Sequence, residues 1–429
     1  MRLSYKYPRD DRFSVERILP ITDRFEYSSV LLSNMYGDDK YSSYESIIAL
    51  GALNVLESND DSFQKLRSFH KKNKDWMFGF MSYDLKNEIE DMSSQNIDNF
   101  NIPNLLFYIP ETVILISADI VTIESTLSKK EIEELFTSTQ DFNSTKSDIE
   151  TPISLQFRET KKEYLRKIKD IKSHIQNGDI YEMNYCQELY NEGSIINPRM
   201  IFKRLNNISK APFSSFFHYK DNYLICGSPE RFLKKQGDKI ISQPIKGTKR
   251  RGVNDIEDEE MISQLKSSQK DISENVMIAD LVRNDLSKTA KKSSVQVEEL
   301  CGIYSFNNLH HMITTITSLL DKDYDFVDVL KGTFPMGSMT GAPKIKAMEL
   351  IERYETTKRS LFSSAFGYIT PETDFDFNVV IRSILHNVTT LHTSVMVGGA
   401  ITINSDEMDE YDESLLKAKS IIKVLDHAE

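Results

Sequence analysis

Four carboxylates occur in two pairs, each with the three-residue spacing that places side chains on one face of a helix. Asp271 and Glu274 form the first pair, and Glu410 and Glu413 form the second, with Lys417 four residues beyond Glu413. Carboxylates from two helices, completed by water and by a carboxylate of the substrate, suit a magnesium ion. Two solvated helix faces are the alternative, because such charges usually lie on the surface. Spacing alone leaves both interpretations open.

A lysine beside a glycine is the candidate nucleophile. Lys246 follows a β-like run and precedes Gly247, where backbone and side chain can both approach a ligand. A lysine becomes nucleophilic when burial or a neighbouring cation favours its neutral form. The next cations along the chain are Lys249, Arg250 and Arg251. A basic surface turn is the alternative, since most lysines are exposed.

Two further segments have the composition of anion sites. The loop 334–344 contains two glycines, two hydroxyls and a proline at a helix start, so its amides can face an anion, or it only caps a helix. Arg382 shares a strand face with Val380 and Ile384, so its guanidinium needs a carboxylate from the protein or from a ligand. His310 and His311 lack the spacing of a zinc site.

The composition limits the class of protein. The 429 residues are 39% hydrophobic and 28% charged, as in a soluble globular chain, with a net charge of -12. This acidic balance argues against binding nucleic acid, and an anionic substrate then needs a locally basic or metal-bearing pocket. Three cysteines cannot build a disulfide framework. No secretion signal or membrane span is evident, so we expect a cytoplasmic protein without a membrane partner.

The elements that must position these residues are strands and helices without strict alternation, which favours an α+β or layered fold. A polar stretch over residues 124–152 predicts a boundary near residue 155, between an N-terminal region, 1–155, and a second region, 156–429. The expected helices are 129–136, 164–175, 271–286, 343–354 and 408–425. The expected strands are 113–116, 180–189, 223–226, 239–243, 365–369, 378–385 and 393–402.

In this order the motifs resemble the chorismate-binding family, which includes anthranilate, aminodeoxychorismate, isochorismate and salicylate synthases. The resemblance covers residues 156–425 and is looser in 76–86. The matching stretches are 178–184, 228–230, 244–248, 274–285, 337–344, 377–382 and 398–402. It implies a layered α/β/β/α fold with two packed antiparallel sheets. Residues 1–155 would be the N-terminal anthranilate synthase component I-like region, and residues 156–429 the catalytic domain.

The resemblance also implies roles for individual residues. Magnesium would be bound by Glu274 and Glu413, with Asp271 and Glu410 holding its waters. Glu230 would protonate the departing 4-hydroxyl, and His311 would lie near the reacting ring. The residues implied to bind chorismate are Gly247, Thr248, Thr340, Tyr368, Arg382, Gly398, Gly399 and Lys417.

Which family member this is depends on two positions. Isochorismate and salicylate synthases have a lysine where this chain has Glu182, and aminating enzymes usually have glutamine. Anthranilate synthases usually have alanine in place of Lys246, whereas aminodeoxychorismate synthases have lysine. In that chemistry the lysine attacks C2 of chorismate, and ammonia from a separate glutaminase subunit then adds at C4. The expected function is therefore aminodeoxychorismate synthase component I, in para-aminobenzoate and folate biosynthesis. The alternatives are anthranilate synthase component I and a non-catalytic chorismate-fold subunit.

Overall fold

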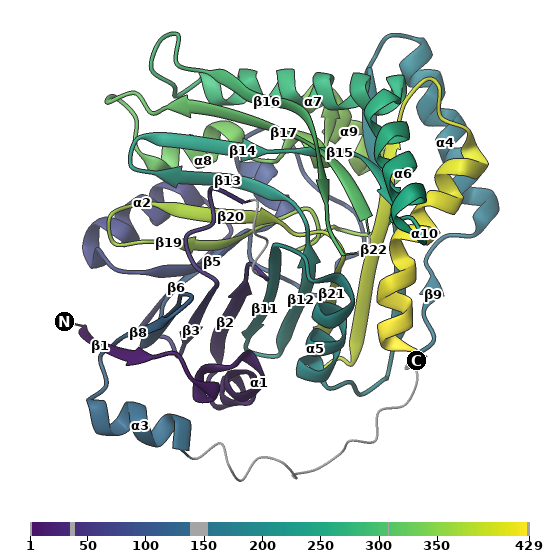
Figure 1. The fold of residues 1–429 in the computed structure, drawn as a ribbon. Coiled ribbons are helices and arrows are strands. Elements are labelled where there is room, and N and C mark those ends of the chain that lie inside the picture. The colour runs from purple at the N-terminus through teal and green to yellow at the C-terminus, as the bar shows by residue number, and fades with distance from the viewer. Residues whose placement is uncertain (1, 35–38, 138–152, 308, 427–429) are drawn as a thin grey trace.

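Two antiparallel sheets dominate the computed structural model, which describes residues 2–34, 39–137, 153–307 and 309–426 (Figure 1). Within these residues one sheet has twelve strands and the other has ten. Strands β2, β11 and β12 run up the page in Figure 1, whereas β13, β14 and β17 run across it. The expected α+β class with two packed antiparallel sheets is confirmed.

The first sheet combines strands from the whole chain. Across it they are β1 (Leu3–Pro8), β8 (Ile120–Ser125), β7 (Thr112–Ile116), β3 (Ser46–Leu50), β2 (Tyr27–Leu32), β11 (Phe213–Tyr219), β12 (Asn222–Ser228), β21 (Ser383–Asn387), β22 (His392–Ile401), β10 (Glu182–Glu192) and β18 (Gly341–Ala342), and β9 (Gln156–Phe157) pairs with β10.

The second sheet is built in the same way. Its order is β15 (Ile245–Arg250), β17 (Leu309–Leu319), β14 (Lys239–Gln243), β13 (Arg231–Gln236), β20 (Phe375–Val379), β19 (Ala365–Ile369), β5 (Met77–Met81), β6 (Leu105–Ile109) and β4 (Asn54–Ser58), and β16 (Gln296–Ser305) pairs with β17.

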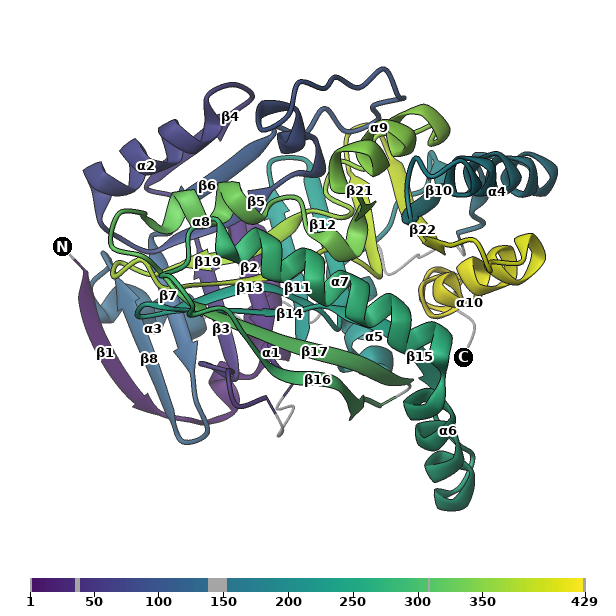
Figure 2. The same ribbon diagram turned by 90° about the horizontal axis from the view of Figure 1, so that it is seen from above.

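Helices cover the outer faces of both sheets. On the first sheet, α5 (Pro198–Ser209) and α10 (Glu407–Leu425) share one buried apolar cluster with the strands. On the second, α2 (Ser62–Asn73), α7 (Gln269–Ser287) and α8 (Phe326–Thr333) share another, and Figure 2 shows α7 lying along that sheet. A third cluster, rich in aromatic side chains, fills the space between the sheets. The order of layers is thus helices, sheet, sheet, helices, so most strands are buried on both faces.

The remaining helices are α1 (Val15–Ile18), α3 (Lys129–Thr137), α4 (Lys161–Gln176), α6 (Asp255–Ser267) and α9 (Lys344–Tyr354). The five expected helices correspond to α3, α4, α7, α9 and α10. Polar side chains cap some of them: the Ser268 hydroxyl accepts from an amide of α7, and the Asp406 carboxylate accepts from two amides of α10. No helix in the described part of the chain is both long and apolar enough to cross a membrane.

The boundary expected near residue 155 does not separate the sheets. Strand β2 pairs with β11, and β5 pairs with β19, so residues on both sides of that boundary build both sheets. Residues 138–152, which make up much of the polar stretch expected there, lie outside the described residues.

One expected strand, 378–385, is wrong. The chain leaves the second sheet at the end of β20 and enters the first at β21, and Arg382 between them has a φ of 51°. Val380 and Arg382 bond to other segments: the Val380 amide donates to the Ser364 carbonyl, and the Arg382 carbonyl accepts from the Gly227 amide. Arg382 therefore lies at the crossing between the sheets and not within a strand.

Candidate active site

Helices α7 and α10 bring the acidic pairs to glycine-bearing strands. Helix α7 packs on β15 and β17, and α10 packs on β22. Gly247 on β15 has a φ of 88°, and a Cβ atom there would lie 2.9 Å from the Cβ atom of Asp271. A Cβ atom on Gly399 of β22 would lie 3.2 Å from Glu410 Oε2 and 3.4 Å from Lys417 Nζ. Glycine at these positions lets backbone and charged side chains approach closely.

Lys246 points into this region and not to solvent. Its side chain is 9% exposed, and its Nζ atom lies 3.6 Å from Oε1 of the fully buried Glu182. The Lys246 ammonium also acts to lower the pKa values of Glu230, Glu274 and Glu413. The candidate nucleophile is thus surrounded by the predicted acid and the predicted metal ligands, which excludes the surface-turn interpretation.

The neighbouring arginines serve a different purpose from the one expected. The Arg250 guanidinium pairs with Glu257, and that of Arg251 pairs with Asp258 at 2.7 Å, both on α6. Acidic residues of α6 therefore neutralise the charges of both arginines. Helix α6 projects from the body of the protein in Figure 2. The cations closest to the metal-ligand candidates are instead Lys417 on α10, whose Nζ atom is 2.8 Å from Glu413 Oε1, and Lys270 on α7, whose Nζ atom is 3.4 Å from Glu410 Oε1.

Glu230 has the properties of a general acid near neutral pH. Burial raises its pKa from 4.5 to about 7, although the Lys246 ammonium acts in the opposite direction. Its backbone is held by the Ser228 hydroxyl, which accepts from the Glu230 amide at 3.1 Å and donates to the Val379 carbonyl at 2.6 Å. The backbone at Glu230 is therefore fixed, and a pKa of about 7 leaves its carboxyl group protonated in a large fraction of molecules at neutral pH.

The carboxylates on the two helices have different environments. Burial raises the pKa of Glu274 to about 7, and its Oε1 atom is buried without a hydrogen-bond partner in the described residues. The Lys417 ammonium, 2.8 Å from Glu413 Oε1, lowers the pKa of the half-exposed Glu413. Glu410 accepts from the Ser405 hydroxyl at 2.7 Å. Among the described residues Glu274 thus lacks the direct ion pair that Glu413 has.

These carboxylates fit a magnesium ion in chemistry but are not a closed cage. Among the described residues no three His, Cys, Asp or Glu side chains are gathered as a metal shell. Magnesium is usually bound by one or two protein carboxylates and keeps several waters. The partnerless oxygen of Glu274 is the observation that suits a cation, because a buried carboxylate oxygen is costly when nothing binds it.

Two cationic side chains of the site, Arg382 and Lys417, suit a substrate with two carboxylates. No ion pair or hydrogen bond of the Arg382 guanidinium is found within the described ranges, and burial lowers its pKa to about 10. Lys417 Nζ donates to the Gly398 carbonyl at 3.0 Å. A ligand carboxylate would supply the partner that the Arg382 guanidinium lacks.

His311 is a neutral imidazole in this site. A hydrogen bond of 3.0 Å joins its Nδ1 atom to the Thr248 hydroxyl. Burial, the Arg382 guanidinium and the Lys417 ammonium together hold the His311 pKa well below its usual value. The predicted Thr248, His311, Arg382 and Lys417 are therefore brought to one region, where His311 acts as a hydrogen-bonding group and not as a cation.

The loop before α9 is fixed by a buried ion pair that the sequence analysis missed. Arg359 binds Glu355 and donates to the carbonyls of Met339, at 2.7 Å, and Asn184, at 3.1 Å. The fully buried Thr340 hydroxyl donates back to loop carbonyls. In sequence Glu355 and Arg359 have the i,i+4 spacing of an ordinary surface pair, so no local signal distinguishes them.

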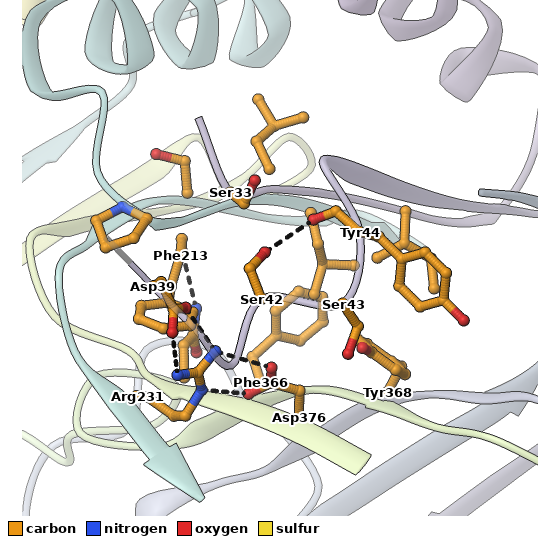
Figure 3. A pocket seen from close by; sticks show the side chains of 16 residues that line it. Ser33, Asp39, Ser42, Ser43, Tyr44, Phe213, Arg231, Phe366, Tyr368 and Asp376 are labelled. Carbon is orange, nitrogen blue, oxygen red and sulfur yellow. Dashed lines mark hydrogen bonds and ion pairs between the residues drawn. The ribbon is translucent and has the colours of Figure 1, made fainter. Parts of the chain in front are cut away.

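Tyr368 lies apart from these residues (Figure 3). Its ring contacts those of Tyr44, at 6.3 Å between centroids, and Trp76, at 5.9 Å, in the cluster between the sheets. Tyr368 lines a pocket together with Arg231 and Asp376, which were not predicted as site residues. No other predicted site residue lines this pocket. Side chains alternate along β19, and Tyr368 is on the face toward this cluster. The structure therefore does not bring Tyr368 to the ring-carboxylate group expected around Arg382.

Comparisons with known proteins agree with this geometry. The model of the chorismate binding enzyme family matches residues 33–423. Aminodeoxychorismate synthase component 1 of Bacillus subtilis is 31% identical over 366 residues, which is 82% of this chain and 77% of that protein. The Escherichia coli protein of the same name is 29% identical over 429 residues, 93% of each chain. The structure of anthranilate synthase component I from Streptococcus pneumoniae has a TM-score of 0.77 at 23% identity, covering 90% of this chain and 95% of that one, which shows the shared fold. This chain belongs to the chorismate binding enzyme family.

Proposed function

We propose that this chain is the chorismate-aminating component of an aminodeoxychorismate synthase, which converts chorismate and ammonia to 4-amino-4-deoxychorismate for para-aminobenzoate and folate biosynthesis. The observation that carries the proposal is Lys246, which is buried and surrounded by Glu182, Glu230 and Glu274. The names of the Bacillus subtilis and Escherichia coli relatives support the same assignment.

The residues divide the reaction between them. The neutral Lys246 amine forms a bond to C2, the ring double bonds shift, and the bond between C4 and its hydroxyl breaks. Glu230 gives its proton to the departing hydroxyl, which leaves as water. Ammonia then bonds to C4, and the electrons of the C2–N bond return to Lys246. The covalent route replaces one difficult displacement by two easier ones.

Positioning of chorismate follows from the cations. We assign one substrate carboxylate to Arg382, whose guanidinium has no carboxylate partner among the described residues, and the other to Lys417. Gly398 and Gly399 keep the backbone beside Lys417 open to the ligand. Orientation of this kind brings C2 to the amine without an entropic penalty in the reaction step.

Magnesium is part of the proposal. Glu274 and Glu413 would hold the ion, with Asp271 and Glu410 binding its waters, and the bound ion would neutralise negative charge on the substrate carboxylate. The partnerless oxygen of Glu274 supports this assignment.

Ammonia must come from another subunit or from solution. Burial raises the pKa values of Cys186 and Cys226 to about 12, and it also raises that of Cys301. A cysteine of a glutaminase acts as a thiolate at neutral pH, whereas burial favours the neutral thiol at each of these three positions. We therefore propose a separate glutaminase partner, as the term component 1 in the names of the relatives suggests.

Incubation with chorismate, ammonium and magnesium, followed by identification of the product, tests the function. We expect 4-amino-4-deoxychorismate, and anthranilate as the only product would refute the assignment in favour of an anthranilate synthase. Without ammonia, mass spectrometry should find a chorismate-derived adduct on Lys246 that is lost in Lys246→Ala and kept in Lys249→Ala, its matched control on β15. Turnover that survives Glu274→Ala undiminished would contradict the metal-ligand role, and no turnover in the parent would support a non-catalytic subunit.

A further inference from the structure

Glu182 is a buried carboxylate with no visible structural partner. It is the first residue of β10, its side chain is 0% exposed, and neither of its oxygens has a hydrogen-bond partner within the described chain. Its nearest cation is Lys246, whose Nζ atom is 3.6 Å from Oε1, slightly beyond hydrogen-bond range. Buried polar groups are rarely left in this condition without a functional reason.

The backbone around Glu182 is held on both sides. The Tyr181 amide donates to the Ala342 carbonyl at 2.7 Å, and the Asn184 amide donates to the Thr340 carbonyl at 2.8 Å. Gly341 adopts a φ of 150°, and a Cβ atom there would lie 2.3 Å from the Glu182 carbonyl oxygen. A rigid strand and a close-packed glycine thus hold the backbone from which the Glu182 side chain extends toward Lys246. Functional side chains require rigid support of this kind.

A purely structural ion pair does not account for this arrangement. Burying two opposite charges is favourable only when geometry is good and other hydrogen bonds satisfy the remaining lone pairs. The Glu182 oxygens have no such bonds, whereas the buried Glu355 carboxylate binds Arg359 and the Cys186 amide. The same chain therefore contains a well-satisfied buried pair for comparison, and Glu182 with Lys246 differs from it.

We propose that Glu182 accepts the proton that Lys246 must lose before its amine attacks chorismate, and returns that proton when the amine is released. The inference rests on the proposed function and deepens it. The Lys246 ammonium and the Glu182 carboxylate become the neutral amine and the neutral acid; the amine bonds to C2 while Glu230 protonates the departing hydroxyl. When ammonia bonds to C4 and the C2–N bond breaks, the free amine takes its proton back from Glu182. The proton that Glu230 lost is replaced from the ammonium ion that supplies the ammonia, so protons and charge balance.

The rate of adduct formation on Lys246 in the absence of ammonia tests this role. In Glu182→Gln, which keeps the shape but cannot accept the proton, we expect adduct formation about 100-fold slower than in the parent. The chorismate concentration for half-maximal rate should change little, because Arg382 and Lys417 bind the substrate. Glu192→Gln, at the exposed end of the same strand, is the matched control and should react at the parent rate.

The dependence on pH separates proton acceptance from a purely structural role. The titratable groups that face the pair are Glu230, Glu274 and Glu413, and all three remain in Glu182→Gln. The deficit of the variant should shrink as the pH rises, since hydroxide then takes the Lys246 proton. A variant that merely distorts the site would keep the same deficit at every pH, which would overturn the proposal.

Other outcomes are equally decisive. A carboxylate that only holds Lys246 in its charged form would make Glu182→Gln faster than the parent, and an equal or faster rate refutes the inference while leaving the proposed function intact. If the parent forms neither adduct nor product, the proposed function fails and this inference fails with it. If Glu182→Gln does not fold, Glu182→Asp replaces it: the carboxylate is withdrawn by one methylene, so adduct formation should be about tenfold slower, and an unchanged rate overturns the proposal.

Discussion

Replacing Glu230 with glutamine should lower activity and raise stability at alkaline pH. The substitution keeps the shape of the side chain but removes the proton that we assign to the departing hydroxyl. With a pKa of about 7 about half of the molecules carry this proton at pH 7, whereas with the ordinary value of 4.5 roughly one in 300 would. We therefore expect product formation to fall about 100-fold or more in Glu230→Gln, with chorismate binding retained.

The effect on stability follows from the same shift. Because the pKa of Glu230 is higher in the folded protein than in the unfolded chain, the stability associated with its neutral form is fully present below about pH 4.5 and is lost as the pH rises through about 7. The rise from 4.5 to about 7 corresponds to about 3 kcal/mol, an upper bound because the site relaxes. The glutamine variant avoids this penalty, so it should be more stable than the parent above pH 8.

Product formation and urea unfolding, both measured between about pH 6 and pH 9, test these expectations. The parent rate should fall about tenfold per pH unit above about pH 7, and the small residual rate of Glu230→Gln should not follow this decline. Glu192→Gln removes a carboxylate from an exposed position and serves as control for both measurements. A Glu230→Gln protein with the parent rate and the parent pH profile would refute the role of Glu230 as the acid, whatever its stability.

Two further substitutions test how the site is built. Gly399→Ala places a methyl group 3.2 Å from Glu410 Oε2 and 3.4 Å from Lys417 Nζ, so we expect weaker chorismate binding, measured as a raised KM, and an unchanged KM would contradict the close approach. Arg359→Met leaves the buried Glu355 carboxylate without its partner and should lower the free energy of unfolding by about 3–5 kcal/mol. Adding Glu355→Gln should recover part of this loss, and a fully additive effect would show that the pair does not interact.

Local sequence pattern predicted much of the secondary structure, because helix caps and apolar periodicity are local properties. Helix α3 and strands β14 and β19 have nearly the expected bounds. The crossing at Arg382 was not predictable in this way, since the residues on both sides of it have strand-like types. What separates them is the change of sheet, which is decided by partners far along the chain.

The sequence named candidate site residues but could not give their arrangement. Lys246 in a basic stretch gives no local sign of burial, and the two arginines beside it turn to α6 instead. Tyr368 was expected in the site but lies elsewhere. The sequence does not show which face of its strand the side chain takes, because only packing decides this. Glu182 had no assigned role, because its closeness to Lys246 depends on contact between two different sheets.

The carboxylates of the site are chemically alike, and they differ in their pKa values and in their partners because their surroundings differ. Burial holds the pKa of Glu230 near 7, so it can donate a proton at the pH where Glu413, beside the Lys417 ammonium, is fully ionised. The pKa of Glu274 is also raised to about 7, and its buried Oε1 atom has no hydrogen-bond partner within the described residues, which supports our assignment of a metal ion to it. We therefore propose different tasks for two carboxyl groups with similar pKa values, one to give a proton and one to receive a metal ion. A shifted pKa alone does not assign a role, and the partners that each oxygen has or lacks complete the assignment.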